Sequence, residues 1–372
     1  MATRPCLVLV LCVGCSSEAA SPDPALDAAV DTATTADAPD TAVDSGMFDT
    51  AVPDGADSGL DAPVDAPPPL LSAKYPGDLG IDKDPAVLWV EDFEEGSVAA
   101  VRGRYEDSKN AAGMALVADV PAKSLGKASM RFTAGGGGPS ATDLYKKLPN
   151  QTELFVRYYV KYQKGIQWHH TGLWIGGYDP PTSWPNPQAG LRPNGDDRFA
   201  IAFEPVGATG AADPRLDFYA YWMTMHSWKD VPTGSDAYYG NTVVHRASLR
   251  AKDDAWSCVE MHVKVNPDPA SKAGAQLGLW VDDVSIAQFD DAAPLGYWVK
   301  DKFCSTTADA PSCTSYPPPA GTTMVPLDLQ LRKTATLQLN HFWPQNYVTA
   351  GPAGNVYFDH MVVARTRVGC LR

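Results

Sequence analysis

Polar and aromatic side chains that could act on a sugar polymer alternate with apolar residues along several segments of this sequence. If the apolar residues face a core, the opposite positions form a surface available for binding or catalysis. Those positions hold Arg157, Tyr159, Lys161, Arg198, Glu204, Asp217, Tyr219, Tyr221, Glu260, His262 and Lys264. Aromatic rings stack on sugars and charged groups bind hydroxyls or carboxylates, so this composition favours a polysaccharide-binding surface.

These residues also include the groups that β-elimination from an acidic polysaccharide requires, namely a cation, a base and an acid. Arg198 could neutralise a uronate carboxylate, His169 or its neighbour His170 could take the C5 proton, and Tyr219 or Tyr221 could protonate the leaving oxygen. The expected substrate-binding residues are Arg157, Tyr159, Lys161, Glu204, Asp217 and His262. Structural roles are the alternative, with the tyrosines packed in strands, Arg198 in an ion pair and the histidines packed in a loop.

Other reaction classes lack their motifs. The sequence contains no Glu-x-Asp-x-x-Glu run, in which two carboxylates serve retaining glucanases. It also contains no GxSxG, HExxH or P-loop motif, which argues against the common hydrolase, zincin and nucleotide-binding classes.

The elements that must position the candidate residues read as strands. Apolar residues alternate at 154–162, 199–203, 216–222, 259–265, 277–281, 337–339 and 356–358, between segments rich in Gly, Pro and Asp. Helical periodicity is scarce, so the sequence predicts an all-β fold, an antiparallel sandwich of two sheets.

The N-terminus has the order of a secretory signal, with Arg4, then an apolar run over 7–13, then small residues. Residues 1–14 are therefore expected to be a signal peptide. The residues Leu11-Cys-Val-Gly-Cys15 resemble the lipobox of bacterial lipoproteins. This resemblance implies that Cys15 is acylated, and Ser16 after it implies the outer membrane or cell surface; ordinary cleavage of a signal peptide is the alternative.

Residues 15–72 are expected to be a disordered tether rich in Asp, Ala and Pro, because they offer little apolar surface to bury. The tether holds 12 of the 44 acidic residues, and only Arg4 of the 30 basic residues precedes Lys74, so most of the net charge of -14 belongs to it. The domain at 73–372 is nearly neutral and lacks a basic nucleic-acid footprint. The expected contact with a membrane is through the lipid anchor alone, and nothing here indicates an oligomeric state.

Four cysteines remain in the domain, an even number for an oxidising compartment. Three pairings are open, and the preferred one joins Cys304 to Cys313 and Cys258 to Cys370. A zinc site is the rival, but no CxxC pair accompanies these residues.

Two end segments, Leu88–Gly96 and Val356–Ala364, resemble the first and last strands of concanavalin A-like jelly rolls, which lie side by side. Trp256–Asn266 with Leu279–Asp283 resembles the strand pair at the middle of such chains. The resemblance implies a jelly-roll sandwich over 73–372. A structural calcium near Asp92 and Asp359 is also possible in such sandwiches, while no cofactor is required.

The segment 155–221 resembles the alginate lyase-like fourteenth family of polysaccharide lyases, through Val156–Tyr162, Gly172-Leu-Trp-Ile-Gly-Gly177, Asp196-Asp-Arg198 and Tyr219-Ala-Tyr221. The family's lysine falls near His169 and its serine at Asp196, whereas Arg198, Tyr219 and Tyr221 match its pattern. The resemblance implies a surface polysaccharide lyase. Because the lysine is replaced, a non-catalytic carbohydrate-binding or adhesion module and a structural envelope lipoprotein are the alternatives.

Overall fold

The computed structural model describes residues 69–138, 140–165, 168–186, 189–206, 215–229, 237–313, 318, 320–349 and 351–372. The expected signal peptide, the lipidation site Cys15 and nearly all of the expected tether lie outside these residues. In the described part of the chain, no helix is long and apolar enough to cross a membrane. Packing begins slightly before residue 73, since Leu71 and Ser72 are buried and their backbone N–H groups bond to the carbonyls of Arg367 and Val368.

Strands provide most of the regular structure of the described residues. The larger sheet, sheet A, contains β1 (Val87–Glu91), β3 (Met114–Val117), β4 (Ser129–Ala134), β6 (Glu153–Tyr162), β10 (Trp256–Lys264), β11 (Gln276–Val281), β12 (Val284–Phe289) and β17 (Gly354–Ala364). Sheet B contains β2 (Asp107–Lys109), β5 (Ser140–Gln151), β7 (His170–Tyr178), β8 (Arg198–Val206), β9 (Arg215–Tyr221) and β16 (Leu339–Val348). A small third sheet is built from β13 (Leu295–Val299), β14 (Lys302–Ser305) and β15 (Val325–Pro326). Among the residues that the structure describes, the helices are α1 (Leu71–Lys74), α2 (Val98–Arg102) and the single turns Pro76–Asp78, Ile81–Lys83, Ala111–Gly113 and Pro311–Cys313.

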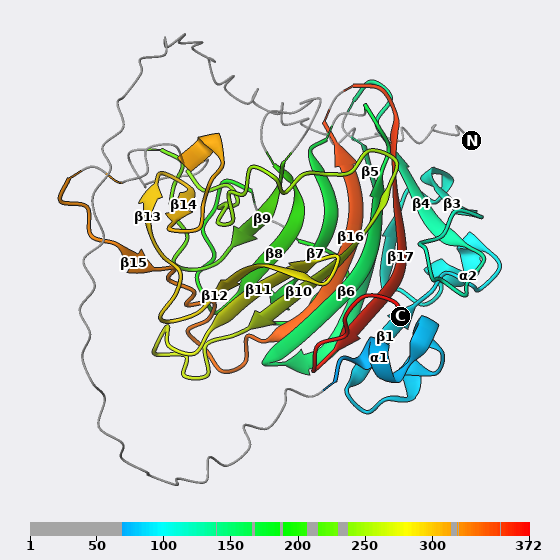
Figure 1. Cartoon of the computed structure of the whole chain (residues 1–372), viewed down its shortest axis with the longest axis horizontal. Coiled ribbons are helices and arrows are strands. Elements are labelled where there is room, and N and C mark those ends of the chain that lie inside the picture. Colours follow the sequence, from blue (N-terminus) through cyan, green and yellow to red (C-terminus); the bar gives the residue numbers. More distant parts are fainter. Residues whose placement is uncertain are drawn as a thin grey trace, which may run out of the picture. The chain divides into compact units, whose positions relative to one another are not determined.

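The strand order shows how distant parts of the chain meet. Sheet A runs β12-β11-β10-β6-β17-β4-β3, with β1 paired to β17, and sheet B runs β2-β5-β16-β7-β8-β9. The first and last long segments therefore lie side by side, and β10 pairs with β11, both as the sequence predicted. Figure 1 shows β1 and α1 beside the C-terminus. The predicted all-β jelly-roll sandwich is confirmed.

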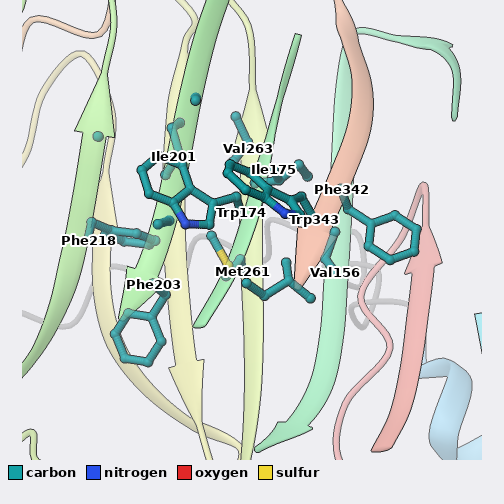
Figure 2. Packing of buried hydrophobic residues seen from close by; sticks show 14 of the residues in the cluster. Val156, Trp174, Ile175, Ile201, Phe203, Phe218, Met261, Val263, Phe342 and Trp343 are labelled. Carbon is teal, nitrogen blue, oxygen red and sulfur yellow. The ribbon is translucent and has the colours of Figure 1, made fainter. Parts of the chain in front are cut away.

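Apolar side chains from the facing sides of the two sheets form one core. Val156 from β6 and Met261 from β10 meet Phe203 from β8 and Phe218 from β9 in the same cluster, as Figure 2 shows. Each is fully buried. The alternation along 154–162 is confirmed, because its apolar set faces this core and Arg157 lies on the opposite side of β6.

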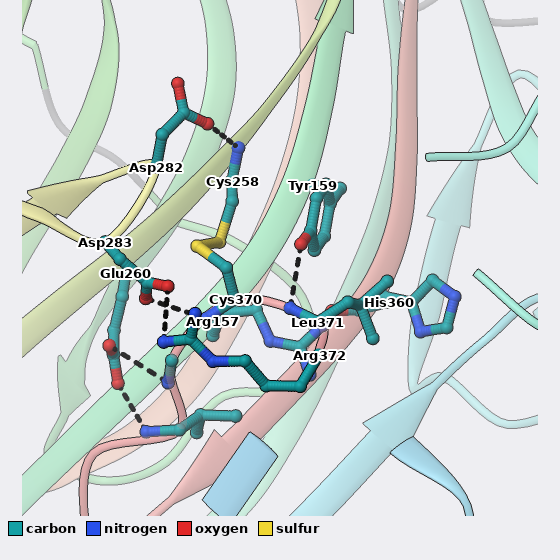
Figure 3. The surroundings of a disulfide bond; sticks show 12 residues. Arg157, Tyr159, Cys258, Glu260, Asp282, Asp283, His360, Cys370, Leu371 and Arg372 are labelled. Carbon is teal, nitrogen blue, oxygen red and sulfur yellow. Dashed lines mark hydrogen bonds and ion pairs between the residues drawn. A yellow bond between two sulfur atoms is a disulfide. The ribbon is translucent and has the colours of Figure 1, made fainter. Parts of the chain in front are cut away.

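Both predicted disulfides are present. Cys304 and Cys313 join β14 to the turn at Pro311–Cys313, and Cys258 of β10 joins Cys370 near the C-terminus. Around the second bridge, Leu371 N donates a hydrogen bond to the hydroxyl of Tyr159 (Figure 3). The C-terminal segment is thereby held against the outer side of sheet A.

Candidate functional site

The outer side of sheet B carries rows of aromatic and polar side chains set by strand register. Trp343, Trp174, Ala202 and Tyr219 are paired across β16, β7, β8 and β9. Adjacent positions on the same side hold His170, Glu204, Gln345, Tyr347, Tyr221 and, on β5, Asp143. We call this surface the aromatic face. Strand alternation places these side chains on the opposite side of sheet B from Ile175 and Phe203. Trp174, Trp343 and Tyr221 are nevertheless buried, and they belong to the same apolar cluster.

His170 and Glu204 form a hydrogen-bonded pair on this face. The His170 Nδ1 atom lies 2.6 Å from Glu204 Oε1, and the carboxylate is 1% exposed while the imidazole is 22% exposed. Burial raises the pKa of Glu204, and the adjacent His170 opposes that rise. A buried carboxylate that holds one ring nitrogen leaves Nε2 as the atom available for proton transfer.

Two tyrosines stand beside this pair. The ring of Tyr219 lies 5.0 Å from that of His170, and the Tyr219 and Tyr221 hydroxyl oxygens are 3.4 Å apart. Burial and the neighbouring Tyr221 raise the pKa of Tyr219 well above its ordinary value, and burial raises the pKa of Tyr221 to about 12. Both hydroxyls therefore remain protonated at neutral pH and can donate a proton or a hydrogen bond.

Two indoles and two carboxylates are buried together at the base of the aromatic face. Trp174 and Trp343 lie side by side, with ring centroids 5.8 Å apart (Figure 2). The indole N–H of Trp174 lies beside Glu204 and that of Trp343 beside Asp143, and each contact opposes the rise in the carboxyl pKa that burial causes. Asp143 Oδ2 also lies 3.9 Å from Lys109 Nζ. Each of these buried carboxylates therefore has a polar partner beside it, as buried polar groups usually do. Burial raises the pKa of Asp143 to about 6.

Arg198 lies on the aromatic face but far from His170. Its register partner on β7 is Tyr178, eight residues beyond His170, which corresponds to about 26 Å along the strand. Its guanidinium binds the Asp197 carboxylate and the carbonyl oxygen of Leu191. The expectation that Arg198 and the histidine act on one sugar is therefore wrong.

Arg215 is a cation at the same end of sheet B as His170. It pairs with Val206 on β8. The β7–β8 register ends at the pair Leu173–Phe203, and its extension by three residues would place Val206 opposite His170. Two strand spacings place the Cα atoms of His170 and Arg215 about 10 Å apart. The Arg215 Nη1 atom donates a 3.0 Å hydrogen bond to Ser312 Oγ.

Four predicted substrate-binding residues lie on the other sheet. Arg157, Tyr159 and Lys161 of β6 and His262 of β10 face outward from sheet A. Arg157 binds Asp78, Lys161 binds Asp119, and His262 binds Glu153. The predicted single surface was wrong because strand parity gives the side of a sheet and does not say which sheet a strand joins.

Two further expectations change on the aromatic face itself. Both Asp217 oxygens accept backbone N–H groups from the segment 243–245, so this carboxylate fixes a loop. His169, expected as the base, has no hydrogen-bond partner at Nδ1 among the described residues. Burial together with the neighbouring His170 lowers its pKa to about 3. Its neighbour His170 holds the position that suits a base.

The acidic residues expected to hold calcium divide into two environments. Glu91, Asp92 and Glu95 offer oxygens within 4.8 Å of one another. The guanidinium of Arg104 pairs with both Glu91 and Glu95, so a cation already lies in this group and the residues do not fit a calcium cage. Asp359 is not a member of the group; burial raises its pKa to about 8. The calcium expectation stays a prediction.

Several residues of the aromatic face were missed from the sequence. His341, Trp343, Gln345 and Tyr347 alternate along β16, a period of two that indicates one face of a strand. Pro344 and Asn346 in the same run make it read as a turn, which concealed the strand. Trp174 stood within the quoted glycine-rich run and could have been chosen by the same alternation.

Solved structures with a related arrangement include three polysaccharide lyases. A double mutant of the alginate lyase Aly36B, bound to an alginate tetrasaccharide, is 9% identical with a TM-score of 0.47, covering 77% of this chain and 99% of that one. The marine PL-14 alginate lyase from Aplysia kurodai is 13% identical with a TM-score of 0.45, covering 75% and 99%. The endo-β-1,4-glucuronan lyase from the fungus Trichoderma reesei is 11% identical with a TM-score of 0.37, covering 75% and 96%. These values are too low to transfer an activity. No family model and no curated protein sequence matches this chain.

Proposed function

We propose that this chain is a surface lipoprotein that acts on an acidic polysaccharide at the aromatic face, by β-elimination. The observation that carries the proposal is the His170–Glu204 pair with the protonated Tyr219 beside it. His170 Nε2 would take the C5 proton of a uronate, and the Tyr219 hydroxyl would protonate the leaving oxygen. Glu204 would hold the imidazole and stabilise its charged form.

Arg215 supplies the charge that this reaction needs at the uronate carboxylate. Negative charge develops on that group as the C5 proton leaves, and a cation nearby lowers the barrier. No Lys or Arg occurs in the internal segments outside the described residues, such as 207–214 and 230–236. Arg215 lies nearer to His170 than Arg198 does, so it is the better candidate to neutralise the uronate carboxylate.

A non-catalytic carbohydrate-binding module is the second candidate, and the hydrogen bond that Arg215 makes within the protein favours it. The guanidinium already binds Ser312, so neutralising a uronate carboxylate would require this hydrogen bond to break. Such a module needs aromatic and polar side chains but no base.

One experiment separates the two candidates. The purified domain is incubated with alginate, polyglucuronate and uncharged polymers, and unsaturated ends are followed by ultraviolet absorbance while affinity electrophoresis measures binding. We expect unsaturated products that fall by about 100-fold or more in His170→Gln with binding retained. The matched control is His262→Gln, which alters a histidine paired with a carboxylate on the other sheet. Binding without product supports the carbohydrate-binding module. The absence of both binding and product on every polymer refutes both candidates.

A further inference from the structure

A serine, a histidine and an aspartate form a hydrogen-bonded chain beside sheet A, away from the aromatic face. Ser124 Oγ lies 2.7 Å from His360 Nε2, and His360 Nδ1 lies 2.9 Å from Asp78 Oδ2. With Asp78 as acceptor at Nδ1–H, the other ring nitrogen accepts the serine hydroxyl. Nucleophile, base and orienting carboxylate thus have the mutual geometry of a serine hydrolase triad, which is recognised by geometry and not by order in the chain.

The neighbouring structure holds this chain of groups firmly. Arg157, fully buried, donates hydrogen bonds to both oxygens of Asp78 and to the carbonyl of His360. Although burial disfavours the charged form, Arg157 and the hydrogen bond from His360 hold the pKa of Asp78 below its usual value. Asp78, His360 and Lys123, which precedes Ser124, all have positive φ angles. Unusual backbone conformations at non-glycine residues cluster at functional sites.

A pocket of about 630 Å³ opens beside these groups. Asp78 and His360 line it, and Leu125 and Gly126, the residues that follow Ser124, form one wall. Leu79 and Leu125 contribute exposed apolar side chains, at 68% and 62% exposure. Ser124 itself is not among the lining residues, so a small acyl group in this pocket would reach the serine past His360 and Leu125.

Backbone donors for a negatively charged oxygen lie in the same turn. Gly126 N donates to Ser124 Oγ at 3.0 Å. The next two N–H groups, of Lys127 and Ala128, both donate to Glu94 Oε1, at 2.6 and 2.8 Å. A carboxylate oxygen thus occupies a pair of adjacent amide donors, the kind of group that stabilises an oxyanion. The Glu94 side chain belongs to an exposed residue and can leave these donors.

We propose that Ser124, His360 and Asp78 hydrolyse carboxylic esters of short acyl chains, an activity separate from that of the aromatic face. Ser124 Oγ attacks the ester carbonyl as its proton passes to His360 Nε2, forming a C–O bond and a tetrahedral oxyanion. Collapse of this intermediate breaks the bond to the alcohol, which leaves with the proton from His360. Water then repeats both steps on the acyl-serine, releasing the acid and restoring the serine.

The charge of Arg157 sets the expected speed of this reaction. An imidazolium forms during the attack, and Asp78 stabilises it less when its charge is shared with a buried guanidinium. Turnover should therefore be slow, and labelling of the serine is a better readout than rate alone.

The test uses the whole chain, with a fluorophosphonate probe for the serine and p-nitrophenyl acetate as the ester. We expect peptide mapping to place the label on Ser124, and Ser124→Ala to lose both labelling and ester hydrolysis above background. The matched control is Ser285→Ala, since the Ser285 hydroxyl on β12 accepts a hydrogen bond from the Gln288 side chain. Melting curves establish that the variants fold, and His360→Gln must also lose the label.

The proposal is overturned if wild type takes no label at Ser124, or if ester hydrolysis is unchanged in Ser124→Ala. It fails or stands independently of the polysaccharide proposal. His170→Gln should keep full labelling at Ser124, and Ser124→Ala should keep full binding of polysaccharide.

Discussion

The two disulfides should differ in their contribution to stability, because they close chain segments of different length. The bridge Cys258–Cys370 spans a sequence separation of 112 residues, and Cys304–Cys313 spans 9. The loop-entropy relation gives about 4.8 kcal/mol for the long segment and about 2.6 kcal/mol for the short one. Replacing both cysteines of one bridge by alanine should therefore cost about 2 kcal/mol more for the long bridge than for the short one.

Contacts near the long bridge act in the same direction. The C-terminal segment donates backbone hydrogen bonds from Val368 and Gly369 to the carboxylate of Glu260, and Arg367 also pairs with it (Figure 3 shows the surroundings). Opening Cys258–Cys370 frees the end that these contacts hold.

Urea unfolding at neutral pH, followed by tryptophan fluorescence, measures the difference. The two double variants control for each other, since each keeps one bridge and loses two cysteines, of which only Cys370 is not fully buried. An equal or larger loss of unfolding free energy in Cys304→Ala/Cys313→Ala would refute the loop-length reasoning.

Three further predictions concern buried groups. Burial raises the pKa of Asp359 to about 8, so Asp359 ionises at lower pH in the unfolded chain than in the folded one. The folded state therefore loses stability relative to the unfolded state as pH rises from about 4 to 8, and Asp359→Asn should become increasingly more stable than wild type over this range. A difference in melting temperature that does not change with pH contradicts this. Added Ca²⁺ should raise the melting temperature of Arg104→Met but not that of wild type, because Arg104 already neutralises Glu91. If Ca²⁺ instead raises the melting temperature of wild type, and Asp92→Asn removes that effect, the calcium expectation is supported. Gly172→Ala should weaken polysaccharide binding at least about 10-fold in affinity electrophoresis, because its Cβ would lie 2.2 Å from Phe203 O and 2.9 Å from Glu204 Cβ; unchanged binding would place the ligand elsewhere.

The fold could be predicted because it depends on local patterns. Alternation along segments such as 154–162 fixed strand type and core face, since side chains in a strand alternate sides. The end segments and cysteine spacing added the pairing of β1 with β17 and the disulfides. Within the aromatic face, Tyr219, Tyr221 and Glu204 were chosen from the same alternation.

The rest depended on which strands become neighbours. Arg157 and Arg198 have equivalent places in the alternation, yet one is buried against Asp78 on sheet A and the other lies on sheet B. Ser124 and His360 are 236 residues apart, and no sequence motif relates them. They become neighbours only because the segment before β4 lies beside β17 in the folded chain. The sequence by itself determined the β-sandwich and the polar character of its outer sides, because those follow from residue periodicity. Only the tertiary structure decided which polar groups share a site, because strand order sets distances that periodicity does not contain.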